Sequence, residues 1–186
     1  MAILKATRAH SIAAVAAVCL AFAVKAAAQT NPVAIEANVK AVFLFNFSKY
    51  VTWPAFAMGE RSPGEVRICV TANNAFFSLL KSAVQGEDID GRPLVAVALD
   101  GLDEAKSCQI LYVGDPRTLD ARAWLTAVSG RQVLTVADGE LTDDTVIAFV
   151  RDDNRIRFDI NRKAANSRNL NISSKLLRLA RQVKDR

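Results

Sequence analysis

The chain has 186 residues, of which 51% are hydrophobic and 23% are charged, and its formal net charge is +5. This length suits one domain that buries a sizeable core. The single histidine, His10, falls in a leader that we expect to be removed, which excludes histidine-based catalysis and histidine-based metal sites from the rest.

The first 28 residues have the layout of a cleavable secretory signal peptide. Lys5 and Arg8 give a basic start, residues 11–24 are almost uniformly apolar, and three alanines precede Gln29. An uncleaved membrane anchor is the alternative. Against it, the apolar stretch is shorter than the roughly 20 residues that a span needs, and Lys25 follows it at once.

Cleavage would leave residues 29–186 as one exported domain, and export implies an oxidising compartment. Three of the 24 Lys and Arg residues lie in the leader, so 21 basic and 19 acidic side chains remain, a net charge of +2. That near-neutral balance provides no overall positive field for nucleic acid.

The two remaining cysteines, Cys69 and Cys108, are expected to form a disulfide in this oxidising compartment. Two separate buried thiols are the alternative.

The segment NVKAVFLFNFSKYVTWP, residues 38–54, predicts a helix over residues 33–51 that ends before Pro54. Lys40 and Lys49 bracket only eight uncharged residues, too few for a membrane span. Apolar side chains occur on every side of this helix, which favours burial in a core or in a tight dimer contact. We expect the ring of Trp53 to be buried and its indole N–H to be paired.

Apolar runs then alternate with helical patterns. Strands are predicted at residues 66–71, 94–99, 109–114 and 131–136, helices at 75–85 and 115–128, and a helical turn at 102–106. This alternation predicts an α/β fold in a single domain. Its mixed, mostly parallel central sheet should have about five to seven strands, flanked by helices on both faces.

The C-terminal part is predicted to be a hairpin at residues 146–160 followed by helices at 162–168 and 173–183. Leu176 and Leu179 should face the domain. Residues 151–186 carry eleven basic and four acidic side chains. Five basic residues form the candidate partner-binding surface: Lys175, Arg178 and Arg181 at helical spacing, with Arg155 and Arg157 on the wet face of the hairpin. A merely solvated face is the alternative.

Short motifs indicate no catalytic or metal site. Ser78 to Lys81 matches the S-x-x-K nucleophile box, but the partner motifs K-T-G and S-D-N are absent. Asp88 to Gly91 is similar to the start of a calcium loop, but it lacks the third oxygen ligand and the distal Glu, so a plain turn is expected. No glycine-rich nucleotide fingerprint occurs. We assign no catalytic residue, metal or cofactor, and we do not expect an enzyme.

Five segments in fixed order carry a family resemblance: VKAVFLFNFSKYVTWP, VRICV, CQILYVG, VLTVAD and IRFDINRKAANSRNLNISSKLLRLAR. The chain resembles the YfiR-like family of bacterial periplasmic proteins over nearly all of its mature length. The strongest matches are the aromatic helix ending at Trp53-Pro54, the R-F-D-I-N box at residues 157–161, and the I-S-S-K-L-L segment at residues 172–177.

The resemblance implies a regulator rather than an enzyme. The best-known members restrain an inner-membrane diguanylate cyclase by contacting its periplasmic sensory region, and their release raises cyclic-di-GMP and favours biofilm formation. The resemblance also implies a homodimer and disulfide-linked stability. A small-molecule sensor that acts through another membrane protein, such as a histidine kinase, is the alternative. Two features depart from the family pattern: Gln109 stands where His is common, and the loop at 137–145 is short and lacks paired glycines.

Overall fold

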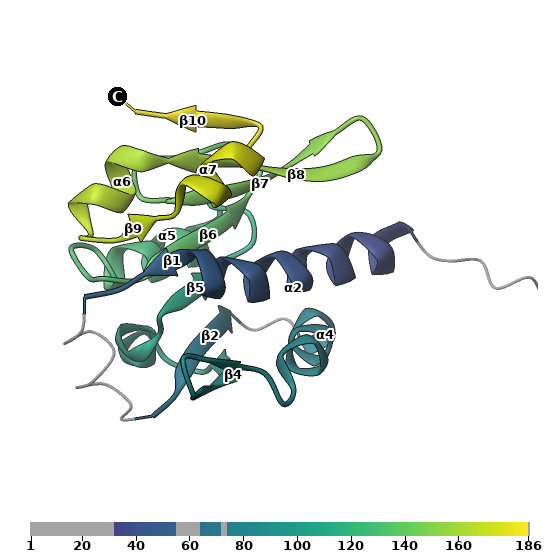
Figure 1. Cartoon of the computed structure of the whole chain (residues 1–186), viewed down its shortest axis with the longest axis vertical. Helices are drawn as coiled ribbons and strands as arrows, with labels where there is room; N and C mark the ends of the chain where they lie inside the picture. The colour runs from purple at the N-terminus through teal and green to yellow at the C-terminus, as the bar shows by residue number, and fades with distance from the viewer. Residues whose placement is uncertain (1–31, 55–63, 72–73, 186) are drawn as a thin grey trace, which may run out of the picture. The chain divides into compact units, whose positions relative to one another are not determined.

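An eight-stranded sheet organises the part of the chain that the computed structural model describes, residues 32–54, 64–71 and 74–185 (Figure 1). Its strand order is β10-β8-β7-β6-β5-β2-β4-β3. The strands are β2 (Val66–Thr71), β3 (Asp88–Ile89), β4 (Arg92–Leu99), β5 (Ile110–Tyr112), β6 (Leu134–Asp138), β7 (Ile147–Asp152), β8 (Arg155–Asn161) and β10 (Gln182–Lys184). All pairings are parallel except those of β7 with β8 and of β4 with β3. The predicted signal peptide lies outside the described residues.

The sheet confirms the predicted mixed, mostly parallel architecture and has one strand more than the upper limit we expected. The two edge strands explain the difference, because β3 has two residues and β10 has three. Segments this short show no readable period of two. A separate two-stranded sheet pairs β1 (Val51–Thr52) with β9 (Asn171–Ile172), which ties the end of the first helix to the C-terminal segment.

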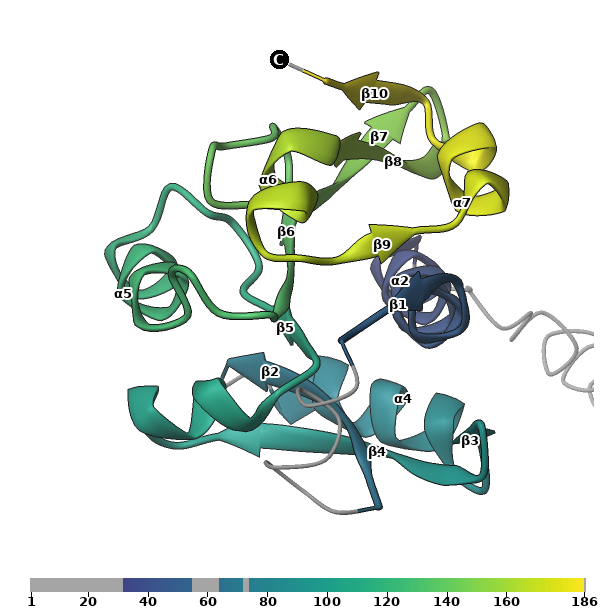
Figure 2. The same ribbon diagram turned by 60° about the vertical axis from the view of Figure 1, so that its left-hand side comes forward.

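Helices cover both faces of the main sheet, as predicted. They are α2 (Pro32–Tyr50), α4 (Asn74–Val84), the 3-10 helix η1 (Leu102–Ser107), α5 (Leu119–Ala127), α6 (Arg162–Ser167) and α7 (Ser174–Leu179). Figure 2 shows α2 and α4 on one side of the sheet and α5 on the other. The helix before Val128 begins later than predicted, at Leu119, because Thr118 caps it by accepting a hydrogen bond from the N–H of Ala121.

Alternating side chains of β2 divide the interior into two cores. Ile68 and Val70 belong to the larger core, together with Leu44 and Phe47 of α2. Cys69 lies between them in sequence and belongs to the smaller core under η1 and α5. Successive side chains of a strand point to opposite faces, so a strand covered on both sides is apolar throughout. This is why VRICV reads as a continuous hydrophobic run.

The aromatic helix α2 is part of the larger core, as its sequence predicted. Phe47 is fully buried, and its ring centroid lies 5.7 Å from that of Phe149 and 5.1 Å from that of Phe158. Phe45 is only partly buried, with the ammonium of Lys49 3.9 Å from its ring centroid. No helix among the described residues is both long enough and apolar enough to span a membrane.

The last predicted helix was too long. Helix α7 ends at Leu179, and Gln182–Lys184 forms β10 beside β8 instead of continuing the helix. Leu176 is buried as expected, whereas Leu179 is 60% exposed, which contradicts the expected inward orientation. The main-chain N–H of Arg181 donates to the carbonyl of Phe158 at 2.8 Å. Pairing along this edge satisfies backbone groups that a longer helix would have used internally.

Candidate functional site

The five basic residues of the predicted partner-binding surface do not share one face. Lys175 and Arg178 are exposed on α7, whose buried residue Leu176 packs in the same core as Phe158 of β8. Arg155 and Arg157 are also exposed. They alternate with Phe158 along β8, so their side chains leave the strand on the opposite face. The structure therefore brings the two groups to one edge of the sheet, on different sides of it.

Arg181 differs from the other four because its guanidinium, although exposed, is paired with the buried carboxylate of Asp159. Its Nε donates to Oδ1 of Asp159 at 2.9 Å, and its Nη2 donates to Oδ2 at 2.5 Å. This hydrogen-bonded pair raises the pKa of the Arg181 guanidinium. Asp159 is only 5% exposed, and this fork-like contact gives both of its carboxylate oxygens a hydrogen-bond donor. Arg181 was predicted to contact a partner, but its guanidinium is already engaged in holding β8.

The exposed edge of α2 carries a stripe of apolar side chains. Ile35 is 50% exposed, Val39 36% and Val42 51%, and their spacing places them along one side of the helix. A shallow hollow of about 260 Å³ lies beside Val39, Val42 and Phe43. Contiguous apolar surface of this kind is typical of protein–protein contacts. The edge of the aromatic helix thus remains a candidate dimer contact.

An ion-pair network fixes the same helix to the sheet. The ammonium of Lys40 lies 2.7 Å from Oε1 of Glu36 and 3.0 Å from Oδ1 of Asp138, and Arg151 also contacts Glu36. The hydroxyl of Tyr112 donates to Oδ2 of Asp138 at 2.8 Å. The hydrogen bond from Lys40 holds the pKa of Glu36 below its ordinary value. Burial, and then the charge of Asp138, raises the pKa of Tyr112 well above its ordinary value.

Cys69 and Cys108 are joined by a disulfide, as expected. Their Cα atoms lie 5.9 Å apart, and the bridge closes a sequence separation of 39 residues. Both sulfurs are fully buried in the smaller core. The bridge fixes β2 to the end of η1, immediately before β5. Gln109, the departure from the family pattern, is almost wholly buried, and its Oε1 accepts a hydrogen bond from the N–H of Arg67 at 2.8 Å.

Arg168 holds the short loop at 137–145, a role that no pattern in the sequence indicates. It is 5% exposed, and its guanidinium donates to the carbonyls of Val128 at 2.8 Å, Asp144 at 3.1 Å and Arg131 at 3.4 Å. Burial lowers the pKa of the guanidinium. One cation thus joins the end of α6, the turn after α5 and the loop that departs from the family pattern. From the sequence alone, a buried Arg in a basic segment cannot be distinguished from a solvated one.

The structure also corrects the environment of Trp53. Its ring is buried, with 6% of the residue exposed, as predicted. However, its indole Nε1–H has no hydrogen-bond partner among the described residues. The expectation that this N–H would be paired is therefore wrong for the protein as described.

The two short motifs have structural explanations. Ser78 and Lys81 are exposed on α4 while Leu80 is fully buried, as in any amphipathic helix. Asp88 to Gly91 forms a tight hairpin turn, in which Oδ1 of Asp88 accepts from the N–H of Gly91 at 2.9 Å. In the described part of the chain, no three His, Cys, Asp or Glu side chains gather in a way that could hold a metal ion.

These observations define a single-domain α/β protein with a buried disulfide and an exposed apolar edge on its first helix. The family model described as YfiR/HmsC-like (DUF4154) matches residues 37–181, and the chain belongs to this family. Family membership makes the chain a periplasmic regulatory protein in general terms. No curated protein matches its sequence.

Two solved structures are similar in part. The first is the ABC domain in complex with L-Trp from Streptococcus pneumoniae, with 14% identity, a TM-score of 0.43, and coverage of 63% of this chain and 55% of that chain. The second is a conserved domain protein from Vibrio cholerae O1 biovar El Tor, with 16% identity, a TM-score of 0.45, and coverage of 63% and 54%. The chain thus spans about half the length of the solved structures that it matches.

Proposed function

We propose that the mature chain is a repressor-type periplasmic regulator that binds the periplasmic sensory region of an inner-membrane diguanylate cyclase. Binding restrains cyclic-di-GMP synthesis and, with it, biofilm formation. The observation that carries this proposal is family membership over residues 37–181, which include most of α2 and nearly all of the C-terminal segment. The chain acts by protein–protein contact and without chemistry of its own.

Four exposed basic side chains at the β8 and α7 edge of the sheet, here called the basic edge, favour a partner with an acidic surface. Arg155, Arg157, Lys175 and Arg178 are exposed, and none of them has an ion-pair partner among the described residues. Uncommitted surface cations raise the rate of association with an acidic protein more than they raise its final affinity. Arg181 contributes no uncommitted charge, because Asp159 neutralises it.

The apolar stripe on α2 supports a homodimer. Two copies of one helix edge can meet across a twofold axis, because an isologous interface needs only one self-complementary patch. Replacing Val39 and Val42 together by Asp should give a monomer by light scattering. Since both side chains are at least partly exposed, the melting temperature of the subunit should change little. A dimer that persists in this variant would contradict the proposed contact.

The decisive experiment combines a functional readout with identification of the partner. The gene is deleted in the source bacterium and complemented with tagged wild type, with R155E/R157E, or with K175E/R178E. Cyclic-di-GMP is measured in each strain, and the membrane protein that copurifies with the tag is identified. Wild type should lower cyclic-di-GMP and retain a GGDEF-domain protein, and at least one charge-reversal pair should lose both effects.

The matched control is R122E/R131E, which reverses two exposed arginines at the α5 end of the molecule. It should repress like wild type. Arg181 is left unchanged, because its reversal would leave the buried carboxylate of Asp159 facing a like charge and could unfold the edge. Recovery of a histidine kinase in place of a GGDEF-domain protein would overturn the proposal in favour of the sensor alternative.

A further inference from the structure

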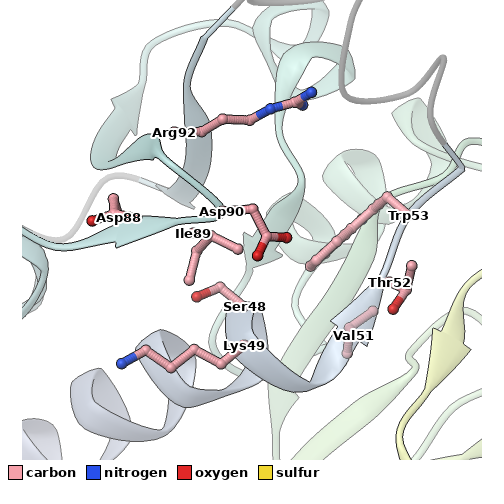
Figure 3. A pocket seen from close by; sticks show the side chains of 9 residues that line it. All are labelled: Ser48, Lys49, Val51, Thr52, Trp53, Asp88, Ile89, Asp90 and Arg92. Atoms are coloured by element: carbon pink, nitrogen blue, oxygen red, sulfur yellow. The ribbon is translucent and has the colours of Figure 1, made fainter.

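A pocket of about 460 Å³ opens between the end of α2, β1 and the β3–β4 hairpin (Figure 3). Its walls include Ser48, Val51, Trp53, Ile89, Asp90 and Arg92. In Figure 3, the side chains of Asp90 and Trp53 approach each other from opposite walls. The guanidinium of Arg92 lies apart from both, at the top of the view. This volume is within the range of pockets that bind small organic molecules.

The hairpin wall is built by a specific turn. Asp90 has a φ of 54° and Gly91 a φ of 77°, the pair of positive values that a two-residue type I′ turn requires. The Asp-Gly sequence meets this requirement, and Asp88 braces the turn by accepting a hydrogen bond from the N–H of Gly91. The register pairs Ile89 with Arg92, so both residues are fixed in place next to the pocket.

Two donors of this pocket are buried and unpaired. Nε1 of Trp53 and Nη1 of Arg92 are each inaccessible, and no described residue accepts a hydrogen bond from either. Both residues line the same pocket. Buried donors without acceptors are rare in proteins, because the donor loses its hydrogen bond to water and gains none within the protein. Two of them at one pocket indicate that an acceptor is missing from it.

The charges around the pocket limit what that acceptor can be. Lys49 is engaged with Glu87 at 3.8 Å and with the ring of Phe45, which leaves Arg92 as the uncommitted cation among the lining residues. Asp88 and Asp90 add negative charge on the hairpin side. A doubly charged phosphate would be repelled by these carboxylates, whereas a single carboxylate matches one guanidinium and offers two acceptor oxygens.

We propose that this pocket binds a small organic carboxylate. Its carboxylate accepts hydrogen bonds from Nε1–H of Trp53 and from Arg92, whose side chains turn toward the cavity on binding because neither unpaired nitrogen is accessible in the described conformation. Its apolar body lies against Val51 and Ile89. The site is separate from the basic edge and from the apolar stripe of α2. Through this pocket a small molecule can regulate the protein, whichever membrane protein is its partner.

The indole N–H resonance of Trp53 tests the contact directly. Nitrogen-15 spectra of the mature protein are recorded during titration with benzoate and, separately, with hexanoate, one flat and one flexible carboxylate. The variant W124F assigns the two indole signals, because Trp124 belongs to the other core. The Trp53 signal should move downfield and saturate with at least one acid, while the Trp124 signal stays in place.

Matched probes and variants separate the proposed contact from adventitious binding. Benzamide, which has the shape of benzoate without its charge, should leave the Trp53 signal in place. R92M keeps the aliphatic stem of the side chain and should weaken carboxylate binding by about tenfold or more, as expected for loss of a charge-assisted hydrogen bond. D90N removes a like charge and should bind at least as tightly as wild type.

Three outcomes would overturn the proposal. They are a Trp53 signal unmoved by either acid, equal binding of benzamide, and undiminished affinity in R92M whose remaining spectrum shows it to be folded. Weaker binding by D90N would also count against it, because that result would mean that the ligand presents a positive or donor group to the hairpin.

Discussion

Replacing Phe47 by Ala is the sharpest test of the core under α2. The side chain is fully buried. Its ring centroid lies 6.0 Å from that of Phe43, 5.7 Å from that of Phe149 and 5.1 Å from that of Phe158, the last in an edge-to-face arrangement. Truncation would leave a cavity bounded by three rings that belong to a helix and two strands. These elements cannot close it without moving relative to one another.

The expected loss of stability follows from this geometry. Burial and cavity terms for Phe→Ala in a core amount to about 3–5 kcal/mol. The higher helix propensity of Ala returns only about 0.5 kcal/mol. We therefore expect Phe47→Ala to lower the free energy of unfolding by about 4 kcal/mol, a large share of the roughly 5–15 kcal/mol that ordinary domains have.

Urea unfolding of the oxidised mature protein, followed by far-UV circular dichroism, measures this loss. The matched control is Phe45→Ala on the same helix, whose ring is only partly buried and lies beneath Lys49, so that we expect about half the loss. A loss below about 1 kcal/mol for Phe47→Ala would refute the placement of α2 in the core. An inverted order of the two variants would refute the orientation of the helix.

Three further predictions follow from the site. Replacing Cys69 and Cys108 by Ala should lower stability by about 4 kcal/mol in urea unfolding, since the bridge closes a long loop. If the oxidised native protein shows two reactive thiols, the bridge itself is refuted. The lowered pKa of Glu36 beside Lys40 means that its contribution is present above its unfolded pKa, near the ordinary value of 4.5, and is lost as the pH falls further. The melting temperature of Glu36→Gln should therefore fall less than that of wild type on acidification below this value, and parallel curves would exclude this role. Arg168→Met should cost about 3 kcal/mol because buried carbonyls lose their donor, with Arg168→Lys intermediate; an unchanged unfolding midpoint would contradict this.

Local sequence patterns were sufficient to predict the order and type of most helices and strands. The strand at Val66–Thr71 has the predicted bounds, and α4 and β4 start within two residues of the predicted positions. These segments are governed by local patterns: continuous apolar runs for strands covered on both faces, and helical spacing for α4. The pairing of Cys69 with Cys108 could also be expected, because removal of the predicted leader, which contains Cys19, would leave these two cysteines with only each other as partner.

Which polar side chains are paired and which are unpaired could be seen only in the folded chain. Arg178 and Arg181 are both basic residues near the C-terminus, yet only Arg181 reaches the buried carboxylate of Asp159. Arg168 likewise finds carbonyls far away in the sequence, and Trp53 meets an unfilled pocket. Such partners depend on where distant segments meet, and no local pattern encodes that. The short edge strand β10 has the same cause, since pairing with β8 overrides the helical preference of its own residues.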